Sequence, residues 1–202
     1  MSGSSSVAAP SPRKSCHREN TPGHAHALTF SCFHRQAFLT RERTCRWFVD
    51  ALAATRDKHG FDLWAFVIMP EHVHVLIRPL RDVYSISAIL ASLKLRVSRR
   101  AERYVRECAP RFLDQMTDVQ PNGQRCVRFW QRGGGYDRNL SSLRYVWEMI
   151  DYIHGNPLRR GLCAHPADWL WSSARYYEDR AAGPLRLDLD SLPPDPRPPL
   201  RL

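Results

Sequence analysis

Residues 61–78 read FDLWAFVIMPEHVHVLIR, and this stretch decides the fold. Its first half, Phe61–Met69, is an apolar run of β-forming residues, which predicts a central strand covered on both faces. Pro70-Glu71 is a turn signal, and the next seven residues alternate in polarity as they do along a strand. We therefore expect an antiparallel hairpin made of residues 61–69 and 72–78.

The segments on either side of this hairpin alternate between strand and helix patterns. The other predicted elements are strands at 26–33 and 126–130 and helices at 41–58, 85–104 and 141–152. The last helix should end near Asn156, because Pro157 disfavours the helical conformation of the residue before it. The order β-α-β-β-α-β-α predicts an α+β fold with a ferredoxin-like antiparallel sheet and helices packed on one face.

Composition favours a soluble protein with an anionic partner. The chain has 202 residues, 43% of them hydrophobic, and 30 Lys and Arg against 20 Asp and Glu give a net charge of +10. Such an excess favours a polyanion, because each neutralised phosphate releases counterions. The longest apolar run, Leu63–Met69, is far shorter than the roughly 20 residues of a membrane-spanning helix, and the N-terminus has no apolar signal-peptide core. We expect a cytoplasmic protein with no membrane partner.

The folded part is expected between two segments of tail-like composition. Residues 1–24 are rich in Ser, Pro, Arg and His and show no periodicity, which predicts a flexible basic tail. Residues 181–202 are rich in proline and predict a second tail. The six cysteines contain no CxxC pair, a scatter typical of reduced thiols, several of them in the core. One domain of residues 25–180 is the predicted organisation.

A pair of histidines in the second hairpin strand is the first candidate for chemistry. Residues two apart on a strand point to the same face, so His72 and His74 should project together while Val73 and Val75 face a core. Two imidazoles about 7 Å apart at Cα can converge on one divalent cation. A partly exposed strand with incidental histidines fits the same spacing, because a lone HxH is a weak motif.

The second candidate lies at the end of the last predicted helix. Tyr152 and Asn156 are four residues apart, so they share a helix face about one turn apart. Such a helix could bring a nucleophile and an amide oxygen to a metal on a neighbouring strand. Taken alone, the segment reads equally as a helix end with Tyr152 packed on the core and Asn156-Pro157 as a breaker.

Taken together, these segments resemble a known family. FVIMPEHVHVLIRP (66–79), FWQRGGGYDRN (129–139) and YIHGNPLRRGL (152–162) occur in the order seen in the single-tyrosine transposases of the HUH nuclease superfamily. The segment from Trp169 to Tyr177 is also similar to that group, and the REP-associated tyrosine transposases are the most similar branch. The resemblance covers roughly residues 25–180, and several ordered motifs make it far more specific than HxH alone.

The resemblance implies roles for individual residues. The two metal-binding histidines fall on His72 and His74, the nucleophilic tyrosine on Tyr152, and the polar ligand four positions later on Asn156. The implied cofactor is Mg²⁺ or Mn²⁺, and the implied reaction is cleavage and rejoining of single-stranded DNA through a 5′-phosphotyrosine. Glu71 matches an acidic position before the histidines, but strand alternation turns it away from the metal, so no chemical role is expected for it.

Basic residues in three segments are candidates for contact with a DNA backbone. They are Lys94, Arg96, Arg99 and Arg100 on the second helix, Arg132 and Arg138 around the glycine run, and Arg159 and Arg160 after the nucleophile helix. For any one of them a solvated helix face is an equally good explanation. Tyr136 and Trp130 could stack on unpaired bases, although Trp130 is also suited to a core.

Two other functions fit part of the pattern. A non-catalytic nucleic-acid-binding module would keep the fold and the charge, and a zinc hydrolase would use the two histidines. The zinc hydrolase lacks a third ligand and an acidic base placed beside them. The implied partner is single-stranded DNA with a hairpin. A monomer and a homodimer both remain open, and residues 110–124 look like an insertion before the last strand.

Overall fold

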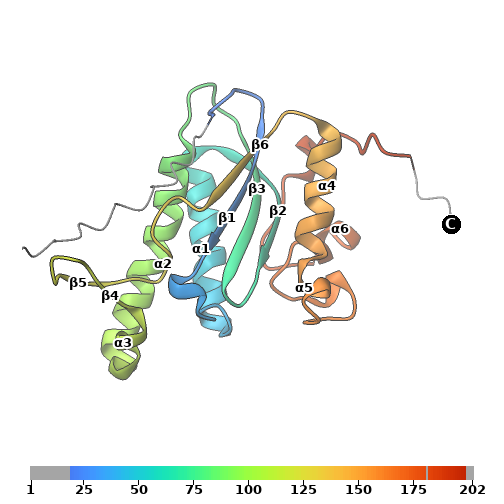
Figure 1. The fold of residues 1–202 in the computed structure, drawn as a ribbon. Coiled ribbons are helices and arrows are strands. Elements are labelled where there is room, and N and C mark those ends of the chain that lie inside the picture. The colour runs from blue at the N-terminus through green and yellow to red at the C-terminus, as the bar shows by residue number, and fades with distance from the viewer. Residues whose placement is uncertain (1–18, 181, 199–202) are drawn as a thin grey trace, which may run out of the picture.

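A four-stranded antiparallel sheet lies at the centre of the computed structural model, which describes residues 19–180 and 182–198. Its strands are β1 (Ala25–Ser31), β2 (Phe61–Ile68), β3 (His72–Pro79) and β6 (Tyr136–Leu140), in the spatial order β2-β3-β1-β6. Every neighbouring pair is antiparallel, and β2 and β3 form the predicted hairpin. This arrangement confirms the predicted α+β fold with a ferredoxin-like sheet (Figure 1).

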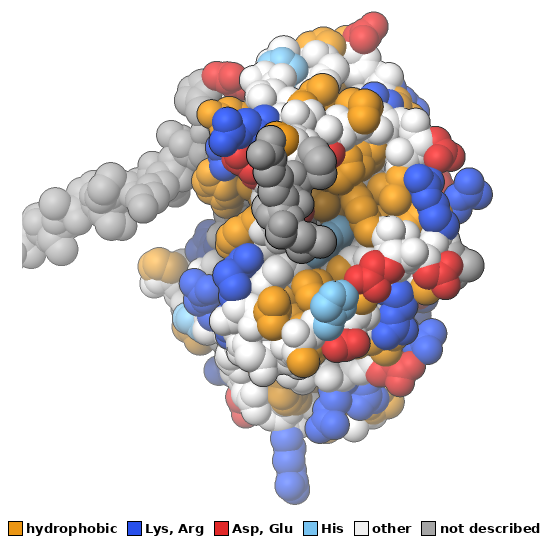
Figure 2. All heavy atoms as spheres, turned by 90° about the vertical axis from the view of Figure 1, so that its right-hand side faces the viewer, with side chains coloured by type: hydrophobic (Ala, Val, Ile, Leu, Met, Phe, Trp, Pro, Cys, Tyr) orange, Lys and Arg blue, Asp and Glu red, His pale blue; other side chains and the backbone are white. Residues whose placement is uncertain are grey.

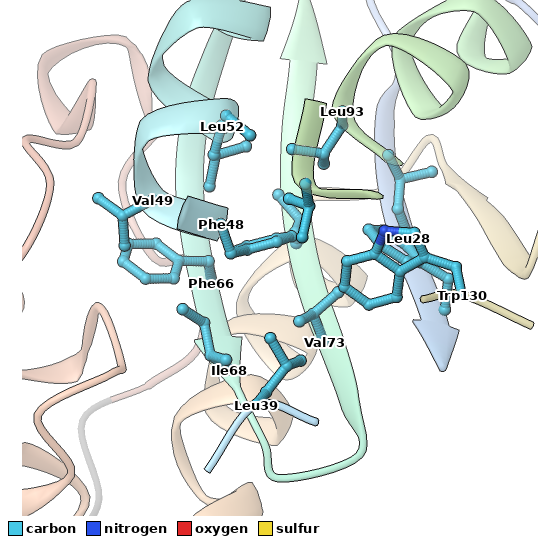
Figure 3. Close-up of a cluster of buried hydrophobic side chains, with 14 of the residues drawn as sticks. Leu28, Leu39, Phe48, Val49, Leu52, Phe66, Ile68, Val73, Leu93 and Trp130 are labelled. Atoms are coloured by element: carbon cyan, nitrogen blue, oxygen red, sulfur yellow. The ribbon is translucent and has the colours of Figure 1, made fainter. Parts of the chain in front are cut away.

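Helices α1 (Glu42–His59) and α2 (Ile86–Cys108) cover one face of the sheet (Figure 1). Phe48 of α1 and Leu93 of α2 meet Phe66 and Val73 of the hairpin in the main core (Figure 3). Trp130 is also buried there, so it packs in the core and is not exposed for base stacking. Fully burying side chains of this size contributes roughly 1.5–3 kcal/mol each, which fixes the register of the sheet.

Helix α4 (Leu143–His154) packs on the opposite face of the sheet. Its residues Val146, Ile150 and Ile153 recur at helical spacing and contact a second core that includes Ala27 and Ala65. These small side chains leave room for the helix close to the strands. The side of the sheet that carries even-numbered residues of β3 is therefore covered by α4.

The chain does not stop being helical at Asn156. After Gly155 it continues into the short helix α5 (Asn156–Arg159), in which Pro157 occupies the first turn. Proline is tolerated there because the amide of a first-turn residue has no intrahelical partner. The predicted end near Asn156 lies two residues beyond the end of α4 at His154, and Pro157 does not break the helical path.

The last strand of the sheet is not residues 126–130, as the sequence suggested. Instead α3 (Leu113–Met116), β4 (Thr117–Val119) and β5 (Arg125–Val127) form a small unit that extends away from the sheet (Figure 1). The sheet is completed by β6, where the sequence predicted only the approach to a helix. The sequence did not predict this strand because Tyr136–Leu140 is polar in composition, as suits its exposed position at the edge of the sheet.

Strand β2 is buried but lies at the edge of the sheet, not in its centre. Its free edge is covered by the segment after α5, which includes α6 (Ala174–Glu178): Ser173 and Phe66 exchange backbone and side-chain hydrogen bonds, and Asp188 accepts from the amide of Leu63 at 2.8 Å. Leu187 is buried here, although proline content predicted a tail from residue 181. Residues 1–18 of the predicted N-terminal tail lie outside the described part.

No helix within residues 19–180 and 182–198 is long and apolar enough to cross a membrane. The five cysteines in this part are free thiols, two of them buried at Cys32 and Cys45. Burial raises the pKa of Cys45 to about 12, which keeps it a neutral thiol suited to packing. Cys16 lies outside the described residues.

Candidate active site

His72 and His74 project together from β3 onto the face covered by α4, while Val73 and Val75 enter the main core. This is the arrangement that strand alternation predicted. The two Nε2 atoms lie 3.0 Å apart, and the two rings are perpendicular. Both side chains are buried, and their Nε2 atoms meet between the sheet and α4.

The other nitrogen of each histidine has its own oxygen partner. Oγ1 of Thr29 on β1 lies 2.7 Å from Nδ1 of His74, and Oε1 of Glu71 lies 3.0 Å from Nδ1 of His72. A carboxylate only accepts, so Nδ1 of His72 donates to Glu71, and the threonine hydroxyl can accept from His74 in the same way. Both Nε2 atoms are then left with lone pairs that face each other, an arrangement that calls for a cation between them.

Glu71 therefore has a role that the sequence did not predict. Strand alternation does not apply to it, because it lies in the turn before β3 begins at His72. Its carboxylate also receives a hydrogen bond from Arg160 at 2.7 Å. Burial raises the pKa of this carboxyl, but Arg160 and His72 outweigh that effect and lower it, so Glu71 is ionised at neutral pH.

Burial also keeps both histidines neutral. It lowers the pKa of His74 to about 3, with smaller contributions from the neighbouring His72 and Arg159. Burial lowers the pKa of His72 as well, against the opposing effect of Glu71. Neutral imidazoles are the form that binds metal ions.

Asn156 and Tyr152 reach the same place from the other side. The side-chain amide of Asn156 is buried, with its nitrogen 3.0 Å from Nε2 of His74, and a half-turn of the amide brings its oxygen there instead. The ring of Tyr152 lies 5.4 Å from the ring of His74 and is 46% exposed. The helical step of four residues thus brings both side chains to the histidines of their own chain.

The donor set fits a divalent cation of the Mg²⁺ or Mn²⁺ type. The two Nε2 atoms lie 3.0 Å apart and the side-chain amide of Asn156 lies 3.0 Å from Nε2 of His74, so the three side chains are close enough together to hold one ion. His72, His74 and Asn156 would occupy three positions and leave the others for oxygens of a substrate. Among the described residues no group of three His, Cys, Asp or Glu is placed to hold a metal, so the amide of Asn156 is the candidate for a third ligand.

Arg159 places a positive charge beside the tyrosine. Its guanidinium carbon lies 4.6 Å from the centre of the Tyr152 ring, and the same group donates to the Tyr152 carbonyl at 2.5 Å. Gly155 makes room for it, because a Cβ there would come within 2.7 Å of Nη1 of Arg159. Of the eight basic residues predicted to contact DNA, Arg159, Arg160 and Arg138 lie around the site.

The basic residues of α2 lie on the other side of the molecule. Arg96, Arg99 and Arg100 line a depression between α1 and α2, on the sheet face opposite to the histidines, and Arg100 pairs with Asp50 at 2.5 Å. Lys94 donates to the carbonyls of Gln131 and Gly133 and so anchors the loop before β6. Arg132 in that loop donates to Gln120. The structure does not bring these residues to Tyr152.

Sequence reasoning missed Thr29 and Glu71, the partners of the two histidines. Thr29 is opposite His74 in the β1–β3 register, a pairing that no local pattern of the sequence reveals. Glu71 was visible beside the histidines, and the signal that could have identified it was its place in the turn, outside the alternation.

Comparison with known proteins shows similarity to transposases in sequence and in fold. Residues 22–116 match the family model described as "Transposase IS200 like". A protein of Haemophilus influenzae named for the REP-associated tyrosine transposases is 25% identical over 126 residues, which span 62% of this chain and 66% of that protein. A solved structure of a REP-associated tyrosine transposase bound to a REP hairpin superposes with a TM-score of 0.61 at 18% identity, covering 85% of this chain and 88% of that one.

The match to the Haemophilus influenzae protein therefore spans just under two thirds of that relative's length. The solved structure shares the fold of this chain. These comparisons agree with the resemblance that the motifs indicated: residues 22–116 are similar to the IS200-like transposases, and a REP-associated tyrosine transposase is among the similar proteins.

Proposed function

We propose that this protein is a transposase-type enzyme that cuts and rejoins single-stranded DNA, with Tyr152 as the nucleophile. The observation that carries the proposal is the position of Tyr152: its half-exposed ring lies 5.4 Å from His74, whose Nε2 faces that of His72. A tyrosine packed only for stability would be buried by the core of α4. Here it stands at the surface beside two neutral histidines.

The reaction would replace one phosphodiester by another. The phenolic oxygen of Tyr152 forms a bond to phosphorus, the bond from phosphorus to the 3′ oxygen breaks, and the proton of the phenol is balanced by the one gained by the 3′-hydroxyl. The product is a 5′-phosphotyrosine. Because the ester energy is retained, a 3′-hydroxyl can attack in the reverse direction, so the same site rejoins DNA without ATP.

His72, His74 and Asn156 would hold the divalent metal, with Glu71 and Thr29 orienting the histidines. When bound, such an ion neutralises charge on the scissile phosphate and makes phosphorus easier to attack. Arg159 lies against Tyr152 and would attract the same phosphate. Tyr152 and the histidines belong to one chain, which supports a site completed without a partner's helix.

The proposed substrate is single-stranded DNA next to a hairpin. A structural relative has been solved with a REP hairpin, and the net charge of +10 suits a nucleic acid. Arg138 and Arg159 beside the site are placed to contact the cleaved strand. Arg96, Arg99 and Arg100 are on the opposite face, so any contact they make with DNA would lie away from the cleavage point.

The test is covalent capture of DNA. Purified protein with Mg²⁺ or Mn²⁺ is incubated with labelled hairpin oligonucleotides that carry single-stranded flanks, and the adduct is detected on a denaturing gel. We expect an adduct that requires the metal and a free 3′-hydroxyl product, and we expect Tyr152→Phe to abolish both. Tyr104→Phe, which removes a tyrosine hydroxyl from α2 on the opposite face of the sheet, is the matched control.

An adduct that persists in Tyr152→Phe would rule out this nucleophile. Hairpin binding with no metal-dependent cleavage of any oligonucleotide would favour the non-catalytic nucleic-acid-binding module. Hydrolysis without a protein-linked product would favour the zinc hydrolase.

A further inference from the structure

A groove runs from the candidate active site along the free edge of the sheet. Its floor is formed by Thr29 and His74, one wall by β6 and the other by α4, and it encloses about 380 Å³. Because β6 is the last strand of the sheet, this groove is open toward solvent on the β6 side. Such a volume lies within the range of small-ligand sites, roughly 300–1,000 Å³.

Three tyrosines line the groove, and all are unusually exposed. The exposed fractions are 59% for Tyr136, 48% for Tyr145 and 46% for Tyr152. Tyr145 and Tyr152 are seven residues apart, two turns of α4, so they lie in one line along the wall. Tyr136 faces them from β6. The side of the molecule on which α4 lies carries exposed hydrophobic groups, with Lys, Arg, Asp and Glu side chains around them (Figure 2).

The charges in the groove are separated between its two walls. Arg138 extends from β6, with its guanidinium carbon 5.4 Å from the centre of the Tyr145 ring. Glu148 lies on the α4 wall and pairs with Arg144 at 2.9 Å. A phosphate would therefore be attracted to the β6 wall and repelled from Glu148, whereas a carboxylate can accept a hydrogen bond from the amino group of a base.

We propose that this groove binds one unpaired nucleotide next to the scissile phosphate, with its base against Tyr136 and Tyr145 and its phosphate at Arg138. The proposal rests on the proposed function, because it takes the nucleotide from the strand that Tyr152 attacks. Exposed aromatic rings beside an arginine are the usual elements of single-strand binding, since every base offers a face for stacking. The groove would position the strand so that the phosphate reaches Tyr152.

The backbone before β6 is built to hold Tyr136 at the mouth of the groove. Gly135 has φ +71°, and a Cβ there would lie 2.3 Å from the carbonyl oxygen of Thr29. Only glycine permits this close approach to β1, and it fixes where the chain enters the strand. Tyr136 then pairs with Thr29, the residue that orients His74.

The test compares loss of a base with loss of a ring. Tyr152→Phe protein, which should bind without cutting, is titrated with a labelled DNA hairpin whose single-stranded flanks are about ten nucleotides long, enough to cover one site. Abasic residues are placed one at a time along the flanks. We expect one position at which the missing base weakens binding roughly 5- to 100-fold, the effect of one stacking contact. Adding Tyr145→Ala should reduce the penalty of the missing base to about twofold, because the base has no ring left to stack on.

Tyr145→Phe keeps the ring and should behave as the parent protein. Arg138→Ala should weaken binding for all sequences and reduce the salt dependence by about one phosphate contact, whereas Arg46→Ala, which removes the same charge from α1 far from the groove, should not. Equal abasic penalties in the presence and absence of Tyr145→Ala at every position would overturn the proposal, and so would a failure of the hairpin DNA to bind.

Failure of the proposed function has a different signature. If wild-type protein forms no adduct but the base and the ring remain coupled in the binding assay, the groove is a nucleotide site without the cleavage chemistry. If the adduct forms and depends on Tyr152 but no coupling is found, the chemistry stands and the groove does not bind the nucleotide.

Discussion

Oε1 of Glu71 lies 3.0 Å from Nδ1 of His72, and the same oxygen receives a hydrogen bond from Arg160 at 2.7 Å. The carboxylate thereby fixes the histidine tautomer, and Arg160 fixes the carboxylate. A residue that lies outside the strand thus determines how a residue within it faces the site.

Replacing Glu71 should weaken metal binding without removing a proposed ligand. Loss of the partner of a ligating histidine typically lowers metal affinity about 10- to 100-fold. We expect Glu71→Ala to show a weakening of this size in a calorimetric Mn²⁺ titration and to need more Mn²⁺ for adduct formation. Glu71→Gln, which keeps an acceptor but loses the charge, should have an Mn²⁺ affinity between those of the wild type and Glu71→Ala. Asp50→Ala, which removes an exposed carboxylate from the opposite face, should leave both measurements unchanged. Unaltered Mn²⁺ affinity in Glu71→Ala would show that the contact does not orient a ligand.

Thr29→Val should destabilise the fold and disturb the same site. The change keeps the shape of the side chain but leaves Nδ1 of His74 buried with no acceptor, at a cost of about 1–3 kcal/mol. Urea unfolding of metal-free protein measures this loss. Thr29→Ser restores a hydroxyl at the same position and should recover most of the stability. If Val and Ser variants unfold at the same urea concentration, the hydrogen bond contributes nothing.

The sequence predicted those parts of the fold and site that depend on local periodicity. Alternation along 72–78 placed His72 and His74 on one face, and the step of four residues brought Tyr152 and Asn156 to them. Contacts between distant segments could not be predicted in this way. Thr29 reaches His74 only through the register of β1 with β3. Asp188, which binds the edge of β2 at Leu63, lies 125 residues after Leu63 in the sequence.

Strand β6 was missed for a related reason. It is a polar edge strand of five residues, and its place in the sheet comes from pairing with β1 and from Gly135, not from its own composition. Family motifs indicated the candidate catalytic residues, and this prediction is tested by the covalent capture of DNA. They could not indicate that Arg96, Arg99 and Arg100 lie on the far side of the sheet.

Gly135→Ala should be one of the more damaging single substitutions outside the core. It combines a positive φ with a Cβ that would lie 2.3 Å from the Thr29 carbonyl oxygen, so β6 would have to move from β1. We expect a loss of about 2 kcal/mol or more in urea unfolding. Gly133→Ala is the matched control, because its φ is also positive at +91° but no atom lies within 4 Å of the added Cβ. That variant should lose only about 1 kcal/mol. Equal losses would mean that the backbone angle, not the contact with β1, makes Gly135 necessary.

His154 should make the stability of the protein depend on pH. Its ring lies between the hydroxyl of Ser173, 2.8 Å from Nε2, and the ring of Tyr177. Burial lowers the pKa of His154 to about 4, against a smaller opposing effect of Asp151. Between pH 6.5 and 4 the unfolded chain binds a proton at this residue that the folded chain does not. The contribution of neutral His154 is therefore complete above pH 6.5 and is lost as pH falls toward 4, up to about 3 kcal/mol.

The measurement is the free energy of unfolding in urea at a series of pH values, on metal-free protein. Wild type should lose stability from pH 6.5 to 4, and His154→Gln should lose less over the same window, whatever its absolute stability. A slope remains in the variant because burial also lowers the pKa of His72 and His74, and both must stay neutral in the folded state. Identical slopes for the two proteins would mean that His154 is protonated as readily in the folded chain as in the unfolded one.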